Sequence, residues 1–358
     1  GRKVLGVGDA SGMFPIDDIS HDWDPGRLTK VDDLLARHHT TLRIEEVFPR
    51  PLDAGRAAGT LTIEGALLLD PSGRLEAGTP LCPPEGDAGT GMVATNAVAP
   101  RTGNVSVGTS IFAMVVLERP LATVHTEIDL VTTPAGHQVA MVHCNNGASE
   151  LGSWADLFGD FARRIGVPVD QDAVFAALLG AALEGEPDAG GLLAYNALAG
   201  EPVIGLDEGR PMIVRTPGSA LTLANFMRAQ IYGSFAALSL GMRTLTAQDV
   251  GLDTMYAHGG VFRTADVAQR FLAAAIDTQV AVSATAGEGG AWGMAVLASY
   301  LINGDGRSLE TFLADDVFAA VASTTIVPSD ADVAGYRTYL ERYEAGLAAE
   351  RAAVAVLR

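Results

Sequence analysis

The sequence predicts an α/β protein built on a mixed or parallel sheet. In its second half, strand-like runs alternate with helical patterns, which is typical of this fold class. With 358 residues, 48% hydrophobic and 19% charged, the chain is long enough for two domains and apolar enough for a packed core. The strand-like runs are Ile111 to Val116, Val139 to Cys144, the first half of Thr254 to Thr264, and Gln279 to Ser283.

Composition excludes several classes of function. A net charge of −19 argues against a nucleic-acid partner or an anionic membrane surface, because both require a basic face on the protein. Cys82 and Cys144 make neither a disulfide framework nor a zinc site and favour a reducing cytoplasm. Apolar runs such as Ala291 to Ile302 are too short to span a bilayer, and no signal peptide is visible.

The N-terminal part predicts small elements joined by turns. Val4 to Ile16 is rich in turn residues and predicts a surface loop. Apolar residues at helical spacing predict a helix from Arg27 to His38, and a small helix is expected from Thr62 to Leu69. The chain starts at Gly1 without a methionine or a typical domain opening, so we expect a fragment of a longer protein.

Longer helices dominate the rest of the chain. Glu201 could face a ligand, but a glutamate in an exposed loop usually has no chemical role. Gly241 is expected to lie at or near the end of its helix. The last helix is expected to pack back across the two lobes. The expected helices are Ser149 to Arg164, Asp172 to Glu184, Thr222 to Arg243, Ala291 to Ile302, and a final one from about Asp330.

The stretch from Pro83 to Met114 carries the main chemical signal. Asp87 follows a glycine and opens an expected helix, about Thr90 to Val98, where backbone donors can hold a carboxylate facing a substrate hydroxyl. Two short strands then meet at Gly108-Thr109-Ser110, a tight turn whose amides and hydroxyls can hold phosphate oxygens. Either motif alone is usually structural, but their order and spacing favour phosphoryl transfer.

A second unit, Thr254 to Thr264, predicts a strand, a Gly259-Gly260 turn and a helix start capped by Thr264. Glycine lets a nucleotide approach the backbone, although the spacing is not the dinucleotide fingerprint. His258 is expected to be a structural residue at the strand end. The glycine loop Ala286 to Gly290, before the helix Ala291 to Ile302, repeats the arrangement.

These motifs, in this order, resemble the FGGY carbohydrate kinases, and the resemblance runs from about Val4 to the last helix. It implies an actin-like ATPase (RNase H-like) α/β fold of two domains, with the first domain incomplete. Residues 1–98 would be the C-terminal part of the sugar-binding domain, 99–330 the ATP-binding domain and 331–358 a closing helix. The family's opening strand-turn-strand has no counterpart and would precede Gly1, so we expect the chain as given to be inactive.

The resemblance also implies roles for individual residues. Asp87 matches the catalytic base and would lie beside Mg²⁺, and Gly108-Thr109-Ser110 would hold the phosphates of ATP. Gly259, Gly260 and Thr264 match the adenosine-binding motif. The closing helix and the segment Gly259 to Thr264 look most similar to ribulokinases and xylulokinases, so the substrate implied is a ketopentose such as xylulose or ribulose.

Two departures from the family pattern are visible. Ala88 stands where many members have Asn next to the catalytic aspartate, and Tyr232 stands where many have Glu. Two other function classes stay open. One is a non-catalytic, actin-like protein that binds ATP or a sugar, and the other is a hydrolase pairing Asp87 with Glu85 or Glu150. Neither a nucleic acid nor a membrane is an expected partner, and a homodimer is left open.

Overall fold

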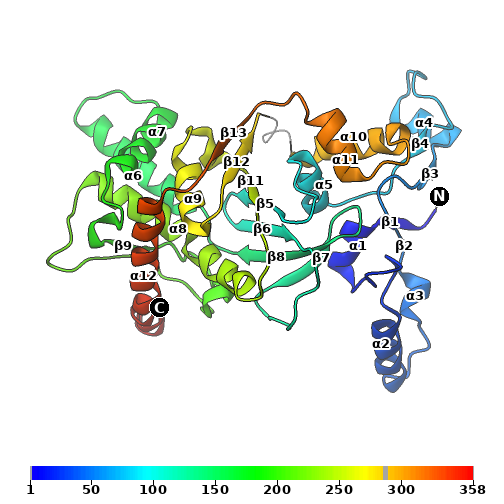
Figure 1. Ribbon diagram of the computed structural model, residues 1–358, viewed down its shortest axis with the longest axis horizontal. Helices are drawn as coiled ribbons and strands as arrows, with labels where there is room; N and C mark the ends of the chain where they lie inside the picture. The colour runs from blue at the N-terminus through cyan, green and yellow to red at the C-terminus, as the bar shows by residue number, and fades with distance from the viewer. Residues whose placement is uncertain (1, 285–288, 358) are drawn as a thin grey trace.

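One seven-stranded mixed sheet organises the computed structural model, which describes residues 2–284 and 289–357 (Figure 1). The strand order is β13-β12-β11-β5-β6-β8-β7. Strands β5, β11 and β12 are parallel, whereas β6, β7, β8 and β13 each run antiparallel to a neighbour. The bounds are β5 Thr102–Val107, β6 Ile111–Val116, β7 Asp129–Thr132, β8 Gln138–Cys144, β11 Thr254–His258, β12 Val280–Ser283 and β13 Ser323–Ile326.

Helices cover both faces of this sheet. On one face, alternate residues of β5 and β6, such as Val105 and Ala113, pack against α8 and α9. On the other face, Met114 and Val116 pack against α5 and α10. The bounds on the first side are α6 Ser149–Arg164, α7 Gln171–Ala181, α8 Leu223–Thr246, α9 Val267–Ile276 and α12 Asp330–Val356, and on the second α5 Asp87–Ala94, α10 Gly289–Asn303 and α11 Leu309–Phe312.

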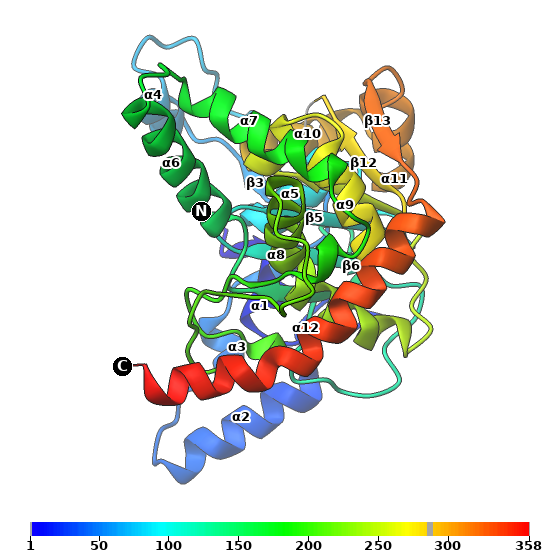
Figure 2. The ribbon, with the colours of Figure 1, turned by 90° about the vertical axis from the view of Figure 1, so that its left-hand side faces the viewer.

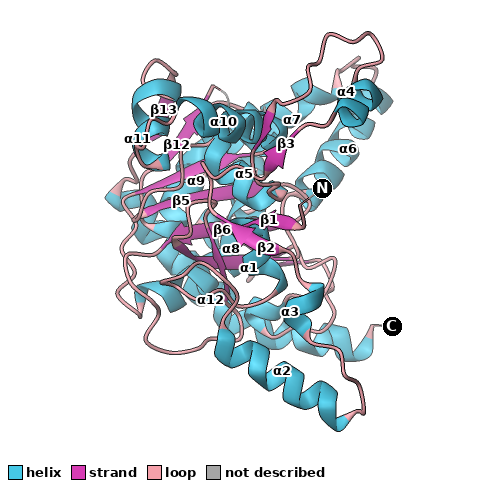
Figure 3. Ribbon diagram, turned by 90° about the vertical axis from the view of Figure 1, so that its right-hand side faces the viewer, coloured by secondary structure: helices cyan, strands magenta, loops and turns pink. Residues whose placement is uncertain are grey.

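The N-terminal segment forms small elements beside the second face. Helix α2 stands away from the sheet and has no buried residue (Figures 1 and 3). The remaining strands here pair two by two, β1 with β2 and β3 with β4, and β9 pairs with β10 further along the chain. The bounds are β1 Val4–Gly6, α1 Val7–Met13, α2 Pro25–Arg37, α3 Ile44–Val47, β2 Arg50–Leu52, β3 Gly59–Thr60, α4 Ile63–Leu69, β4 Pro80–Leu81, β9 Leu193–Tyr195 and β10 Met212–Val214.

The expectation of a surface loop from Val4 to Ile16 is wrong. This segment holds β1 and α1, and α1 packs against β7. The hydroxyl of Ser11 accepts a hydrogen bond from the Thr132 amide at 2.8 Å, and the Thr132 hydroxyl donates to the Val7 carbonyl at 3.1 Å. These contacts with a distant strand stabilise a helix that its glycine-rich sequence does not favour.

Gly241 does not end its helix, because α8 continues to Thr246. A Cβ at Gly241 would overlap the side chain of Val142, so this glycine allows α8 to approach β8 closely. Thr264 is not a helix cap either. Asp266 precedes α9 instead, in a left-handed conformation with φ of 65°.

The last helix packs against one lobe rather than across two. Helix α12 contacts α8, α9 and β9, and Figure 2 shows it running across the side of the molecule that these helices form. Its apolar stripe is buried there, as the sequence pattern predicts. The residues of that stripe are Tyr336, Leu340, Tyr343 and Leu347.

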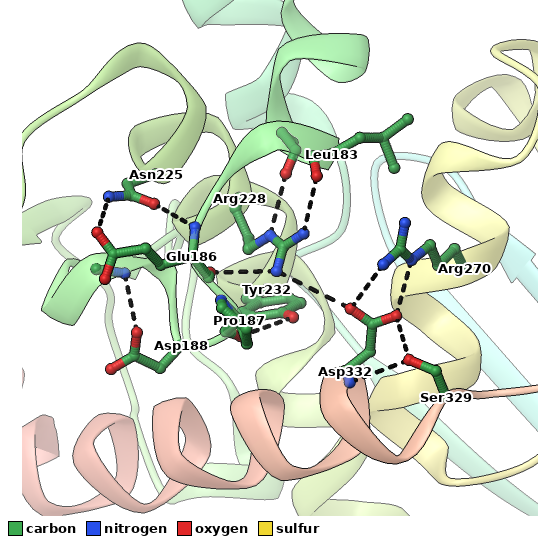
Figure 4. A network of polar contacts seen from close by, with 12 residues as sticks. Leu183, Glu186, Pro187, Asp188, Asn225, Arg228, Tyr232, Arg270, Ser329 and Asp332 are labelled. Carbon is green, nitrogen blue, oxygen red and sulfur yellow. Dashed lines mark hydrogen bonds and ion pairs between the residues drawn. The ribbon is translucent and has the colours of Figure 1, made fainter.

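A buried ionic network holds the start of α12 (Figure 4). The carboxylate of Asp332 accepts hydrogen bonds from Arg270 at 2.8 and 3.1 Å and from the Ser329 hydroxyl at 2.7 Å. The Arg228 guanidinium lies 4.0 Å away and donates to the carbonyl groups of Ala182 and Glu186. Arg228 and Asp332 are both almost fully buried. Their network joins α8, α9 and α12 to the segment that follows α7.

Candidate functional site

Three segments with predicted roles meet at one edge of the sheet. Because β5, β11 and β12 are parallel, their carboxyl ends lie at the same edge, which we call the carboxyl edge. The turn Gly108-Thr109-Ser110 follows β5, the turn Gly259-Gly260 follows β11, and helix α10 begins soon after β12. In open α/β sheets, ligands bind outside this edge.

The backbone of the Gly108-Thr109-Ser110 turn is held by hydrogen bonds from two amides that follow β8. The amides of Gly147 and Ala148 donate to the carbonyls of Thr109 and Gly108 at 2.7 and 2.8 Å. Within the described parts of the chain, the amides of Thr109 and Ser110 donate no hydrogen bond. Their N–H groups can therefore receive the oxygens of an anion, as the sequence analysis predicts for this turn.

The second glycine turn lies directly beside the first. Ser106 of β5 and His258 of β11 are register partners at the strand ends. Gly259 has φ of 126°, and a Cβ there would overlap the Val107 carbonyl, so only glycine fits this close approach. Burial lowers the pKa of His258 and favours its neutral form, which agrees with the structural role expected for it.

The remaining predicted residue of this unit, Thr264, is half-buried at the end of a 3₁₀ turn, Gly260–Arg263. Residues 286–288 of the expected glycine loop lie outside the described residues. The helix expected after that loop is confirmed as α10, with Gly289 at its start.

Asp87 lies at the same edge because α5 and α10 pack closely. A Cβ at Gly293 of α10 would overlap the Thr90 carbonyl of α5, and one at Gly290 would lie 3.7 Å from the Asp87 Cα. The first residue of α5 is thus next to the start of α10. Asp87 is exposed, and its carboxylate makes no hydrogen bond with the residues that the structure describes. This carboxylate is free to meet a ligand.

Two further carboxylates, those of Glu85 and Asp9, lie near Asp87, and the contacts that they make were not predicted from the sequence. Glu85 accepts hydrogen bonds from the amides of Gly8 at 3.1 Å and Asp9 at 2.8 Å, at the start of α1. A Cβ at Gly86 would overlap the carboxylate of Asp9, which places Asp9 against the glycine preceding Asp87. Gly8 and Asp9 lie 77 and 76 residues before Glu85, and no local pattern in the sequence indicates their contact with it.

The position of Glu85 does not support its pairing with Asp87 as a hydrolytic acid and base. Its two oxygens are engaged by the backbone of α1. Burial raises the pKa of Glu85 from 4.5 to about 7, against the lowering effect of the amides of Asp9 and Gly8, and the nearby charge of Asp9 raises it further. Glu85 therefore joins α1 to the segment that carries Asp87.

A pH-dependent stability is expected from Glu85. Its pKa is about 7 in the folded chain against 4.5 as its ordinary value, so its stabilising contribution is complete below pH 4.5 and is lost as pH rises through 7. The loss amounts to about 3 kcal/mol. Urea unfolding at pH 5 and pH 8 should show this fall in the unchanged chain, and Glu85→Gln should reduce it. An equal fall in both proteins would contradict the assignment.

A divalent metal fits this edge only together with a ligand that brings its own oxygens. The described residues contain no group of three or more His, Cys, Asp or Glu side chains placed to hold a metal. Mg²⁺ usually takes one or two protein carboxylates and completes its shell with phosphates and water. The exposed carboxylate of Asp87 fits such a role.

Glu201 is not in the exposed loop environment expected for it. It is 1% exposed and accepts hydrogen bonds from Asn146, which precedes the amides that hold the Gly108-Thr109-Ser110 turn. No local pattern indicates this burial, because Asn146 lies 55 residues earlier in the chain.

No helix among the described residues is long and apolar enough to cross a membrane. The acidic charge and the absence of basic clusters in the sequence remain the argument against a nucleic-acid partner.

Comparison with solved structures places the fold. The chain is similar to xylulose kinase from Rhodospirillum rubrum, with TM-score 0.74 and 20% identity over 98% of this chain and 64% of that one. It is similar to gluconate kinase from Lactobacillus acidophilus, with TM-score 0.74 and 17% identity over 97% and 65%. It is also similar to Plasmodium falciparum glycerol kinase with ADP, with TM-score 0.70 and 16% identity over 98% and 63%.

These likenesses confirm the predicted actin-like ATPase fold with its central mixed sheet. The chain spans less than two thirds of the length of each of these relatives. No curated protein matches the chain. The division into domains at residue 98 stays a prediction, and α5, which precedes it, packs against α10, which follows it.

A family comparison covers more than half of the chain. Residues 103–302 match the C-terminal domain of the FGGY family of carbohydrate kinases. The match includes both glycine turns of the carboxyl edge, whereas Asp87 lies before it. The chain therefore belongs to the FGGY family of carbohydrate kinases.

Proposed function

We propose that this protein is an ATP-dependent carbohydrate kinase in which Asp87 is the catalytic base. The observation that carries the proposal is the pair of adjacent glycine turns at the carboxyl edge, together with Asp87 beside the start of α10, whose carboxylate has no hydrogen bond among the described residues. The unpaired amides of Thr109 and Ser110 would hold phosphate oxygens. Gly259, Gly260 and Thr264 would lie along the adenosine.

The chemistry follows from the charges that develop during transfer. Asp87 accepts the proton of the attacking sugar hydroxyl, whose oxygen forms a bond to the γ-phosphorus while the bond to ADP breaks. The turn amides stabilise the negative charge on the phosphoryl oxygens. Mg²⁺, when bound, would neutralise part of the phosphate charge, and we propose that Asp87 would be its protein ligand.

The substrate proposed is a small sugar, most simply a ketopentose such as xylulose or ribulose. The relatives similar in fold are described as kinases of xylulose, gluconate and glycerol. The segment Gly259 to Thr264, with its Gly-Gly-Val-Phe-Arg-Thr sequence, favours the ketopentose choice. The proposed kinase would need no partner beyond sugar and nucleotide.

The test is ADP release by the protein in its full-length form with ATP·Mg²⁺ and a panel of ketopentoses, polyols and aldoses. We expect one ketopentose to stimulate release strongly over the rate without sugar. If ATP binds but no sugar on the panel stimulates release, the kinase proposal fails, and a non-catalytic nucleotide-binding protein takes its place.

A further inference from the structure

A buried carboxylate that the proposed reaction does not use lies behind the phosphate turn. Glu201 is 1% exposed, and one of its oxygens, Oε1, has no hydrogen-bond partner among the described residues. A buried carboxylate with an unsatisfied oxygen is costly and needs a compensating role. Its surroundings indicate what that role is.

The other oxygen of Glu201 holds a single residue. Oε2 accepts hydrogen bonds from both the backbone amide and the side-chain Nδ2 of Asn146, each at 3.1 Å. The Asn146 Oδ1 in turn accepts from the amides of Leu198 and Ala199 at 2.8 and 2.9 Å. The loop that carries Glu201 therefore holds Asn146 at two places, through the Glu201 carboxylate and through the amides of Leu198 and Ala199.

The residues that follow Asn146 hold the phosphate turn. Gly147 and Ala148 donate their amides to the carbonyls of Thr109 and Gly108. A Cβ at Gly147 would overlap the Gly108 carbonyl, so the two backbones touch directly. Asn196 adds a hydrogen bond from its Nδ2 to the Gly147 carbonyl at 2.9 Å. A shift of Asn146 would thus move the turn itself.

We propose that Glu201 and Asn146 are positioning residues for the nucleotide. They fix Gly147 and Ala148, which turn the carbonyls of Gly108 and Thr109 backward and leave the amides of Thr109 and Ser110 facing the ligand. The proposal rests on the proposed function, because it assumes that this turn binds the phosphates of ATP. It assigns to Glu201 an effect on nucleotide affinity without any contact with the nucleotide.

Burial raises the pKa of Glu201, while hydrogen bonds from Asn146 and from the backbone of Asn145 and Val203 lower it, and the net direction is upward. Glutamine keeps an acceptor oxygen for both Asn146 donors, and its amide nitrogen replaces the oxygen that has no partner.

The experiment titrates the protein in its full-length form with a fluorescent ATP analogue and Mg²⁺, well below the unfolding temperature of every variant. We expect Glu201→Ala to raise Kd about tenfold, because the two Asn146 donors lose their acceptor. Glu201→Gln should stay within about twofold of the unchanged chain. Amide exchange at Gly147 and Ala148 should speed up in Glu201→Ala and not in Glu201→Gln.

Glu350 offers a matched control. It is also fully buried, and its Oε2 has no hydrogen-bond partner among the described residues. Its Oε1 accepts a hydrogen bond from the amide of Arg210 at 2.6 Å, and Arg210 lies at the other end of the loop that begins near Glu201. Glu350→Ala should destabilise the chain comparably but leave the Kd for the analogue within about twofold.

The outcomes separate this inference from the proposed function. If the unchanged chain binds the analogue and Glu201→Ala binds it equally well, the positioning role is wrong and the proposed function stands. An equal weakening by Glu350→Ala would also overturn it, because the effect would then reflect stability alone. If the unchanged chain binds no analogue, the proposed nucleotide site fails, and the inference fails with it.

Discussion

Replacing Asp87 by asparagine in the full-length protein is expected to lower kcat by about 10²–10⁴-fold, since the amide cannot take the proton of the sugar hydroxyl. A larger loss would indicate that the carboxylate also places the metal. Binding of the nucleotide without Mg²⁺ should change little, because the amides of the phosphate turn lie on other elements. The measurement is steady-state ADP release at saturating sugar and ATP·Mg²⁺.

Two controls accompany this variant. Asp87 is exposed at the start of α5 and its carboxylate has no hydrogen bond within the described residues, so its replacement should not disturb folding. Asp172 is a matched acid, exposed in the first turn of α7, which lies away from α5 in Figure 1. Asp172→Asn should retain full activity. Retention of activity by Asp87→Asn would remove Asp87 from the proposed mechanism.

Replacing Asp332 by alanine is expected to lower the free energy of unfolding by about 3–5 kcal/mol. The change removes the carboxylate from the network in Figure 4 and leaves the buried guanidinium of Arg228 without a counter-charge. Arg270 is partly exposed and can be solvated instead. Burial opposes ionisation of Asp332, but the hydrogen bonds from Arg270 and Ser329 hold its pKa below the usual value.

A pair on the surface of the same helix provides the comparison. Glu344 of α12 pairs with Arg243 of α8 at 2.7 Å, and both side chains are about half exposed. Glu344→Ala should therefore change stability by less than about 1 kcal/mol. Urea denaturation of both variants at pH 7 measures the difference. Equal destabilisation would mean that the buried network does not stabilise the start of α12.

Local patterns in the sequence were sufficient for the elements whose own residues favour them. The helix Ser149 to Arg164 is confirmed at both ends, because its apolar face and its composition both favour a helix. The hairpin around Gly108-Thr109-Ser110 is confirmed between β5 and β6. The helix expected from about Thr90 to Val98 is present as α5, but it starts at Asp87 and ends four residues earlier than Val98.

The features that were missed depend on contacts between distant parts of the chain. Helix α1 forms where the Glu85 carboxylate accepts hydrogen bonds from the amides of Gly8 and Asp9. The sequence of Val4 to Ile16 does not indicate these contacts. Glu201 is buried because Asn146 lies against it. The position of Asp87 beside the start of α10 is not visible in local patterns, since it requires the packing of α5 against α10.

The most direct test of the account is to map where ATP·Mg²⁺ protects backbone amides of the full-length protein from hydrogen exchange. We propose that the nucleotide binds at the carboxyl edge, so protection should concentrate at Gly108 to Ser110 and at Gly259 to Thr264. Protection confined to other segments, or binding without protection at either turn, would contradict the assignment of this edge as the nucleotide site.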